Sequence, residues 1–203
     1  MNQRNYQREL DRLIAQNSAE QKVPSLYLHS CCAPCSSYVL EYLSEYFRIT
    51  VFYYNPNIYP REEYWKRVEE QQRLIAQMPL KHPVQFAEGE FDDRRFYESV
   101  RGMEKEPEGG VRCEQCFRLR LSETVKKAKE AGADYFATTL TISPLKNAPL
   151  INQIGEELAA EYGVPWLPSD FKKKNGYKRS TELSTEYGLY RQDYCGCVFS
   201  VRK

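Results

Sequence analysis

The sequence predicts one α/β domain built on a parallel sheet with helices on both faces. Short runs rich in apolar, β-branched and aromatic residues alternate with longer segments whose apolar residues recur at helical spacing. The length of 203 residues suits one well-buried domain and would cramp two. Hydrophobic residues make up 41% and charged residues 28%, a balance typical of a folded globular chain.

The predicted elements alternate regularly through most of the chain. We expect residues 1–22 to be an N-terminal helical extension, with the helix at about residues 8–16, and residues 23–203 to form the domain. Within it, strands are predicted at 25–29, 48–54, 84–87, 134–139 and 164–166, and helices at 36–47, 61–77, 92–101, 114–131, 150–162 and 179–187. Residues 168–203 break the alternation as a basic loop, a helix and a cysteine tail.

Composition narrows the function classes. No apolar stretch approaches the ~20 residues that cross a bilayer, and the polar N-terminus lacks the apolar core of a secretory signal, so we expect a cytoplasmic protein without a membrane partner. The net charge of +1 excludes a globally basic nucleic-acid binder but permits a local basic face.

Seven cysteines fall into three groups: Cys31-Cys32-x-x-Cys35, Cys113-x-x-Cys116 and Cys195-x-Cys197. In a reducing compartment, clustered cysteines more often bind metal or perform redox chemistry than form disulfides. Thiolates in this number suit zinc or an iron–sulfur cluster, and spacing alone does not separate the two. The last pair is too close for a relaxed disulfide, which favours an electron relay or a further pair of metal ligands.

The placement of the cysteines points to one edge of the sheet. Cys31 follows the first predicted strand directly, where ligands of open α/β sheets bind, and the turn has no glycine with which to cradle a phosphate. Cys113 and Cys116 lie at a predicted helix start, where the helix dipole, Arg112 and Arg118 are expected to favour thiolate over thiol.

Polar residues supply further candidates. His29 is interpreted as a hydrogen-bonded strand-end residue in preference to a catalytic one, and Asp193 as a proton donor, a metal ligand or a solvated carboxylate. Lys146 and Asn147 follow the fourth strand and can meet an anionic substrate. The last candidates form a basic, aromatic patch that predicts salt-sensitive RNA binding, or else a solvated loop: Lys172, Lys173, Lys174 and Tyr177.

Five motifs in order resemble the epoxyqueuosine reductase QueH family over about residues 25–200. They are Cys31-Cys-Ala-Pro-Cys35, Tyr54-Asn-Pro-Asn-Ile-Tyr-Pro60, Arg112-Cys-Glu-Gln-Cys116, Thr138-Thr-Leu-Thr-Ile-Ser-Pro144 and Tyr194-Cys-Gly-Cys197. The resemblance implies a HUP-like fold (adenine nucleotide hydrolase-like). It also implies reduction of epoxyqueuosine to queuosine at the wobble position of a tRNA anticodon loop, the last step of that modification.

The resemblance also implies roles for the cysteines. Cys31, Cys32, Cys113 and Cys116 match the ligands of a [4Fe–4S] cluster, and Cys195 and Cys197 match a redox-active pair. We further hypothesise that Cys35 helps bind a second iron ion beside the cluster, and we expect tRNA and an external electron donor as partners. Two alternatives remain: a structural zinc module that binds tRNA without redox activity, and an ATP-using RNA thiolase, which the missing glycine-rich loop disfavours.

Overall fold

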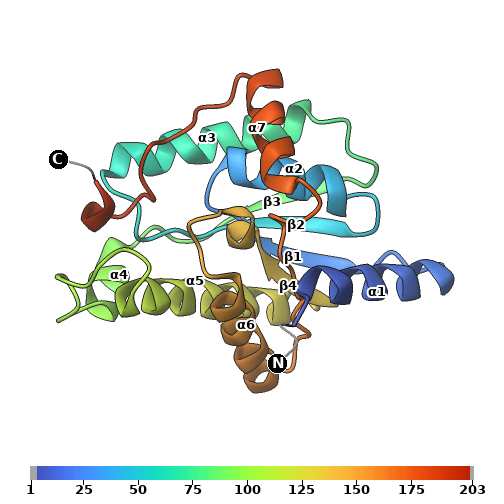
Figure 1. Ribbon diagram of the computed structural model, residues 1–203, viewed down its shortest axis with the longest axis horizontal. Helices are drawn as coiled ribbons and strands as arrows, with labels where there is room; N and C mark the ends of the chain where they lie inside the picture. Colours follow the sequence, from blue (N-terminus) through green and yellow to red (C-terminus); the bar gives the residue numbers. More distant parts are fainter. Residues whose placement is uncertain (1–3, 202–203) are drawn as a thin grey trace.

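A four-stranded, wholly parallel sheet forms the centre of the protein (Figure 1). In spatial order its strands are β3 (Val84–Glu88), β2 (Arg48–Tyr53), β1 (Ser25–His29) and β4 (Tyr135–Thr138). The computed structural model describes residues 4–201, so the first three and last two residues of the expected terminal segments lie outside it. The predicted α/β architecture with a parallel sheet is confirmed.

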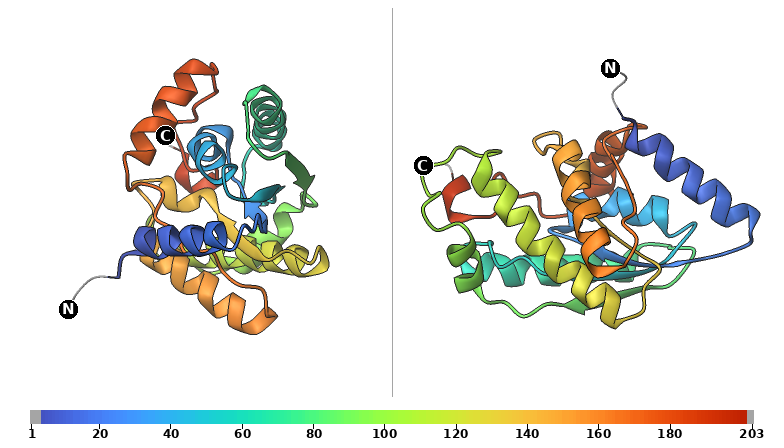
Figure 2. Two further views of the ribbon diagram at one scale, coloured as in Figure 1. Left: turned by 90° about the vertical axis from the view of Figure 1, so that its right-hand side faces the viewer. Right: turned by 90° about the horizontal axis from the view of Figure 1, so that it is seen from below.

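Helices cover both faces of the sheet (Figure 2). They are α1 (Tyr6–Ala19), α2 (Ala33–Leu43), α3 (Arg61–Gln77), α4 (Asp93–Ser99), α5 (Val111–Glu130), α6 (Ala148–Tyr162) and α7 (Gly176–Glu186), with short 3-10 helices η1 (Thr139–Ile142) and η2 (Val198–Ser200). Within residues 4–201, no helix is long and apolar enough to span a bilayer.

Alternation along the strands creates two apolar cores. Leu28 and Val51 point into the core on the α2 and α3 side, which Leu10 of α1 also enters. Tyr27 and Phe52 point to the opposite face, where α5 and α6 pack. Both faces of the sheet are therefore buried, as expected for parallel strands.

The prediction of a fifth strand at residues 164–166 is wrong. Only an isolated bridge between Phe136 and Trp166 forms. The Phe136 N–H donates to the Pro165 carbonyl at 3.0 Å, and the Phe136 carbonyl accepts from the Leu167 N–H at 2.9 Å. Pro165 has no N–H with which to extend a ladder, and Pro168 follows shortly after, so the segment pairs once and leaves the sheet.

Several helix boundaries also differ from those predicted. The second helix begins at Ala33, because Pro34 suits the first turn of a helix, and it ends four residues early at Leu43. The fifth begins at Val111 and the seventh at Gly176, each three residues before the predicted start. The cysteines at positions 35 and 113 are thereby placed inside first turns.

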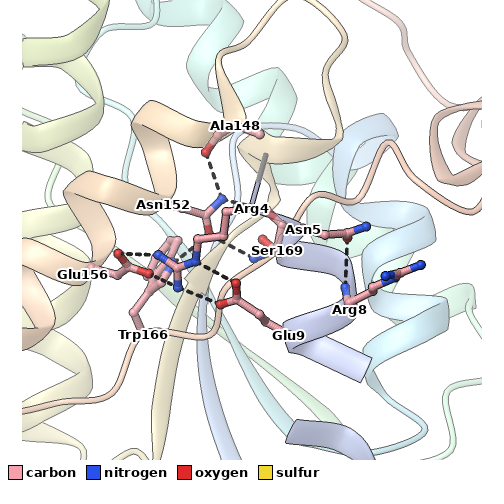
Figure 3. Close-up of polar contacts among 9 residues, drawn as sticks. All are labelled: Arg4, Asn5, Arg8, Glu9, Ala148, Asn152, Glu156, Trp166 and Ser169. Carbon is pink, nitrogen blue, oxygen red and sulfur yellow. Dashed lines mark hydrogen bonds and ion pairs between the residues drawn. The ribbon is translucent and has the colours of Figure 1, made fainter. Parts of the chain in front are cut away.

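Asn152 anchors α6 against the segment that follows it (Figure 3). Its buried amide donates to the carbonyls of Ala148 and Ser169, both at 2.8 Å, and accepts at 3.0 Å from Trp166 Nε1 and from Ser169 N–H. All four polar contacts of this one side chain are made with backbone or indole groups, so they join the beginning of α6 to the segment that follows the helix.

Arg4 joins the N-terminal helix to the same region (Figure 3). Its guanidinium contacts Glu9 of α1 at 2.6 Å and Glu156 of α6 at 2.7 Å. Since these groups are partly exposed, the pairs orient α1 more than they stabilise it.

Candidate metal and redox site

The first thiol group lies at the carboxyl end of β1, an inner strand of the sheet. The strands β2 and β3 lie on one side of β1 and β4 lies on the other, so the strand order reverses at β1. Cys32 precedes α2, and Cys35 lies in its first turn. The sulfur atoms of Cys31, Cys32 and Cys35 all lie within 4.8 Å of one another, and those of the first two are 3.9 Å apart. Among residues 4–201 this is the only group of three or more potential ligands so close together, and it can hold a metal ion.

Hydrogen bonds hold the turn that carries these thiols. Ser30 N–H donates to the Phe52 carbonyl at 3.0 Å, and the Asn55 amide donates to the Ser30 carbonyl at 2.8 Å. The Tyr53 hydroxyl donates to the Cys31 carbonyl at 3.1 Å. The neighbouring strand β2 therefore fixes the position of the triad.

The three thiols differ in acidity. Hydrogen bonding with Cys32 and Cys35, supported by the charges of Lys146 and Arg120, lowers the pKa of Cys31 well below its usual value despite burial. The hydrogen bond with Cys31 raises the pKa of Cys32 to about 12. The hydrogen bond between Cys31 and Cys35 is the main cause that raises the pKa of Cys35. Among the three, Cys31 is therefore the thiol that loses its proton most readily, and Cys32 and Cys35 are the thiols that donate to its sulfur.

The second thiol group combines the beginning of α5 with the C-terminal tail. Buried Cys116 and Cys197 belong to one apolar cluster with Phe96 and Val100, and Phe199 of η2 packs against it. Figure 1 shows η2 beside α4 and the amino-terminal end of α5. The tail thus returns across the molecule to the helix that carries the second cysteine motif.

Two adjoining cavities connect the groups. One, of about 180 Å³, is lined by Cys31, Cys35 and Cys195 among others; the other, of about 140 Å³, is lined by Cys113, Cys116, Cys195 and Cys197. Cys195 and Lys146 line both. All three sequence motifs therefore meet at one edge of the sheet, although Cys113 and Cys116 lie outside the close triad.

Arg120 is a buried cation between the two groups. Its guanidinium is 2% exposed, donates to the Cys116 carbonyl at 3.2 Å and to Asn55 Oδ1 at 3.3 Å, and forms none of the ion pairs seen within residues 4–201. Its Nη2 has no hydrogen-bond partner among them. Burial opposes its charge, but Cys116 and Cys31 outweigh burial and raise its pKa. A buried cation without a carboxylate needs another anion, and thiolates are the nearest candidates.

Lys146, in the loop before α6, is a second cation that interacts with the cysteines. Burial alone would lower its pKa, yet Cys195, Cys31 and Cys35 together raise it. Two cations therefore face sulfur atoms contributed by all three motifs.

The expected thiolate state of Cys113 and Cys116 is wrong for the metal-free protein. Burial raises the pKa of Cys113 despite the Gly109 N–H that donates to its sulfur at 3.2 Å, and it raises that of Cys116 to about 12. Arg118 turns away from both thiols to pair with Glu157 at 2.8 Å. Desolvation outweighs the helix dipole here.

The predicted polar residues Asp193, Tyr177 and Asn147 all line one of the two cavities. Asp193 and Tyr177 are exposed and line the first cavity, whereas Asn147 lines the second. The Asn147 side chain also caps α6, accepting from Leu150 N–H at 3.1 Å, so one of its polar atoms already has a structural role.

The basic loop is partly neutralised by ion pairs. Lys172 pairs with Asp170 at 2.8 Å, and Lys174 pairs with Asp11 at 2.7 Å, while Lys173 is exposed. Partly exposed pairs of this kind exchange readily, so they leave these lysines able to meet phosphates.

His29 has the structural role interpreted from the sequence. Its buried ring lies 2.8 Å from Thr138 Oγ1 and 3.2 Å from the Tyr54 carbonyl. Burial, and then the charge of Arg120, lowers its pKa to about 3, so the ring is neutral near pH 7.

Comparison with known proteins decides the family. Residues 26–203 match the model of the family described as epoxyqueuosine reductase QueH. The chain belongs to this family. It is 46% identical over 200 residues to "Epoxyqueuosine reductase QueH" of Streptococcus pyogenes serotype M1, covering 98% of this chain and 78% of the relative. The protein of that name from Thermotoga maritima is 37% identical over 181 residues, covering 87% of this chain and 90% of the relative.

In this QueH-family chain, α3 holds the cysteine tail. Glu70 accepts from Tyr190 N–H at 2.7 Å, and Glu63 accepts from the Tyr190 hydroxyl at 3.2 Å and from Arg67 Nε at 2.7 Å. The Arg67 guanidinium lies against Gly196, whose φ of 122° suits glycine and where an added Cβ would stand 3.1 Å from Arg67 Nη1. A buried ion pair therefore positions the loop between the last two cysteines.

Sequence reasoning missed Arg67 and Arg120. Arg120 lies four residues after Cys116 and seven after Cys113, so helical periodicity alone would have placed it on the cysteine face of α5. The i,i+4 spacing of Glu63 and Arg67 predicts an ion pair on α3, but the contact of Arg67 with Gly196 could not be predicted, because the tail is more than 120 residues away in the sequence.

Proposed function

We propose that this chain reduces epoxyqueuosine to queuosine in tRNA in the cytoplasm, using a [4Fe–4S] cluster held by Cys31, Cys32, Cys113 and Cys116. The relatives' name gives the reaction. The observation that carries the assignment to these residues is the convergence of three cysteine motifs around Arg120 and Lys146 at the carboxyl edge of the sheet.

The residues present fit an iron–sulfur cluster. The donors are thiols, the ligand type that such clusters prefer, and the cavity walls that carry them are largely apolar. A cluster with four thiolates is an anion, and Arg120 and Lys146 offer the positive charge that would offset it. When bound, the cluster supplies single electrons at low potential.

The reaction needs two electrons and two protons. Both C–O bonds of the epoxide break, an alkene forms, and the oxygen leaves as water. The Cys195 and Cys197 thiols can balance the equation: two S–H bonds are replaced by one S–S bond, which releases two electrons and two protons, and an external donor then reduces the disulfide. In the structure both thiols are free. Asp193, which shares the first cavity with Cys195, would protonate the leaving oxygen.

Cys35 is the third thiol of the close triad and is not among the four cluster ligands proposed above. Its sulfur lies within the close triad, so it would help to hold a second iron ion beside the cluster. Such an ion would act as a Lewis acid on the epoxide oxygen.

The substrate would approach across the mouths of the two cavities. Lys146 and Asn147 lie at this edge, and Tyr177 offers a stacking surface at the first cavity. The lysines at 172–174 would contact backbone phosphates of the anticodon loop.

Serine variants of the tail test the relay. Cys195→Ser and Cys197→Ser proteins should bind iron and sulfide as the parent does but should fail to form queuosine in multiple turnover, whereas Cys31→Ser should lose the cluster. Anaerobic iron and sulfide analysis, absorbance and nucleoside analysis of the tRNA measure the three effects. Unchanged multiple turnover would refute the relay, and a colourless protein with zinc alone would support the non-redox tRNA-binding module.

A further inference from the structure

Leu145 is the most exposed large hydrophobic residue in the described chain. Its side chain is 80% exposed, compared with 50% for Val111, the next. A lone exposed leucine is ordinary on a protein surface, but the position of this one is not. It lines both cavities, and so stands at the point where the two thiol groups open to the exterior.

The turn that presents Leu145 is rigid. Leu145 N–H donates to Ser143 Oγ at 3.3 Å, and Lys146 N–H donates to the Ser143 carbonyl at 3.2 Å. Pro144 fixes the backbone before it, and the Asn147 cap ties the turn to α6. A backbone constrained in this way loses little further freedom when a ligand covers the Leu145 side chain, so the cost of ordering falls on the side chain alone.

The proposed substrate presents a gap for such a side chain. A base in an anticodon loop is stacked between its neighbours, and it must leave that stack before its substituent can reach thiols inside a cavity. Proteins that unstack bases often insert an apolar side chain beside the neighbour left behind. Lys146, the next residue, lines both cavities and would offer a positive charge to the displaced nucleotide.

We propose that Leu145 is a specificity residue that inserts beside the base flanking the modified nucleotide and holds that nucleotide turned into the cavities. The inference rests on the proposed function. It assigns to Leu145 a role in substrate positioning and none in electron transfer or metal binding.

Two RNA hairpins carrying epoxyqueuosine at the wobble position test the proposal. One has its natural 3′ neighbour, and the other has an abasic nucleotide there, which removes the stack that Leu145 would replace. Leu145→Ala should lower kcat/KM about 10-fold or more on the first hairpin and leave it near the parent value on the second. The Leu145→Met protein should retain most of the parent activity. Val111 is an exposed aliphatic residue that lines neither cavity, so Val111→Ala should have no effect.

A binding measurement separates this inference from the proposed function. With 2-aminopurine as the 3′ neighbour, binding of the parent protein should raise its fluorescence as the stack opens, and Leu145→Ala should raise it much less at saturation. An equal rise, or an equal loss of kcat/KM on both hairpins, overturns the role of Leu145. If the parent reduces neither hairpin, the proposed function fails, and the fluorescence comparison still decides the insertion.

Discussion

At the scale of single residues, Arg120 has the most specific consequence for the metal site. Replacing it with Met removes a buried cation that no carboxylate balances, but it also removes hydrogen bonds to the Cys116 carbonyl and to Asn55 Oδ1, so the unfolding temperature of the metal-free protein should change little. The same change removes one of the two cations that face the thiolate ligands and leaves only Lys146, so the affinity for iron should fall about 10-fold or more. Thermal unfolding and competition with a chelator measure the two effects.

Arg112 provides the matched comparison. It is also buried, but its guanidinium donates to the Glu104 carbonyl at 3.0 Å and covers the Phe199 ring at 4.6 Å. Arg112→Met should therefore destabilise the metal-free protein by about 1–3 kcal/mol. If Arg120→Met is destabilised to the same degree and binds iron normally, Arg120 is a structural residue.

His29 predicts a pH dependence of stability. Its folded pKa of about 3 lies below the ordinary value of 6.5, so its contribution is complete above pH 6.5 and is lost as the pH falls from there toward 3. Between pH 6.5 and 5, His29→Gln should reduce the loss of unfolding free energy by about 2 kcal/mol. Urea unfolding at both pH values measures the difference, and a His29→Gln protein whose unfolding free energy falls with pH as steeply as that of the parent would contradict it.

At the scale of elements, the contact between α3 and the tail is the most sensitive to substitution. Glu63→Gln leaves the buried Arg67 guanidinium without its carboxylate and should cost about 3 kcal/mol of unfolding free energy. Amide exchange should accelerate over residues 188–197, because Tyr190 loses the same partner. Glu62→Gln, an exposed change on the neighbouring residue, should alter neither measurement. Exchange that rises evenly over the whole chain would contradict a local role for the pair.

At the scale of the whole molecule, a net charge of +1 leaves little general attraction for RNA, so binding must depend on local charge. Alanine at Lys172, Lys173 and Lys174 should weaken tRNA binding and reduce the slope of log K against log salt by up to about 2. Alanine at Lys126, Lys127 and Lys129 removes the same amount of charge. These lysines lie near the end of α5, away from the cysteines at its beginning, so the slope should change little. A triple 172–174 variant that binds like the parent at every salt concentration would exclude this loop.

The sequence predicted the fold and the convergence of the cysteines because both follow from local patterns. Strand and helix periodicity gave the alternation, and the position of Cys31 after β1 gave the sheet edge. The single bridge between Phe136 and Trp166 was predicted as a full strand at residues 164–166, since a short apolar run does not show that its proline interrupts pairing. The acidity of Cys113 and Cys116 was also missed, because burial depends on the packing of segments far apart in the sequence.

The segment after α6 covers part of one edge of the sheet, at β4. An edge strand offers unpaired amides and carbonyls to other molecules, and β4 is such an edge. The bridge through Trp166 occupies the Phe136 amide and carbonyl, and the prolines at 165 and 168 cannot donate to an incoming strand. Substituting both prolines with threonine would therefore be expected to let this segment pair with a strand of another molecule and so promote aggregation.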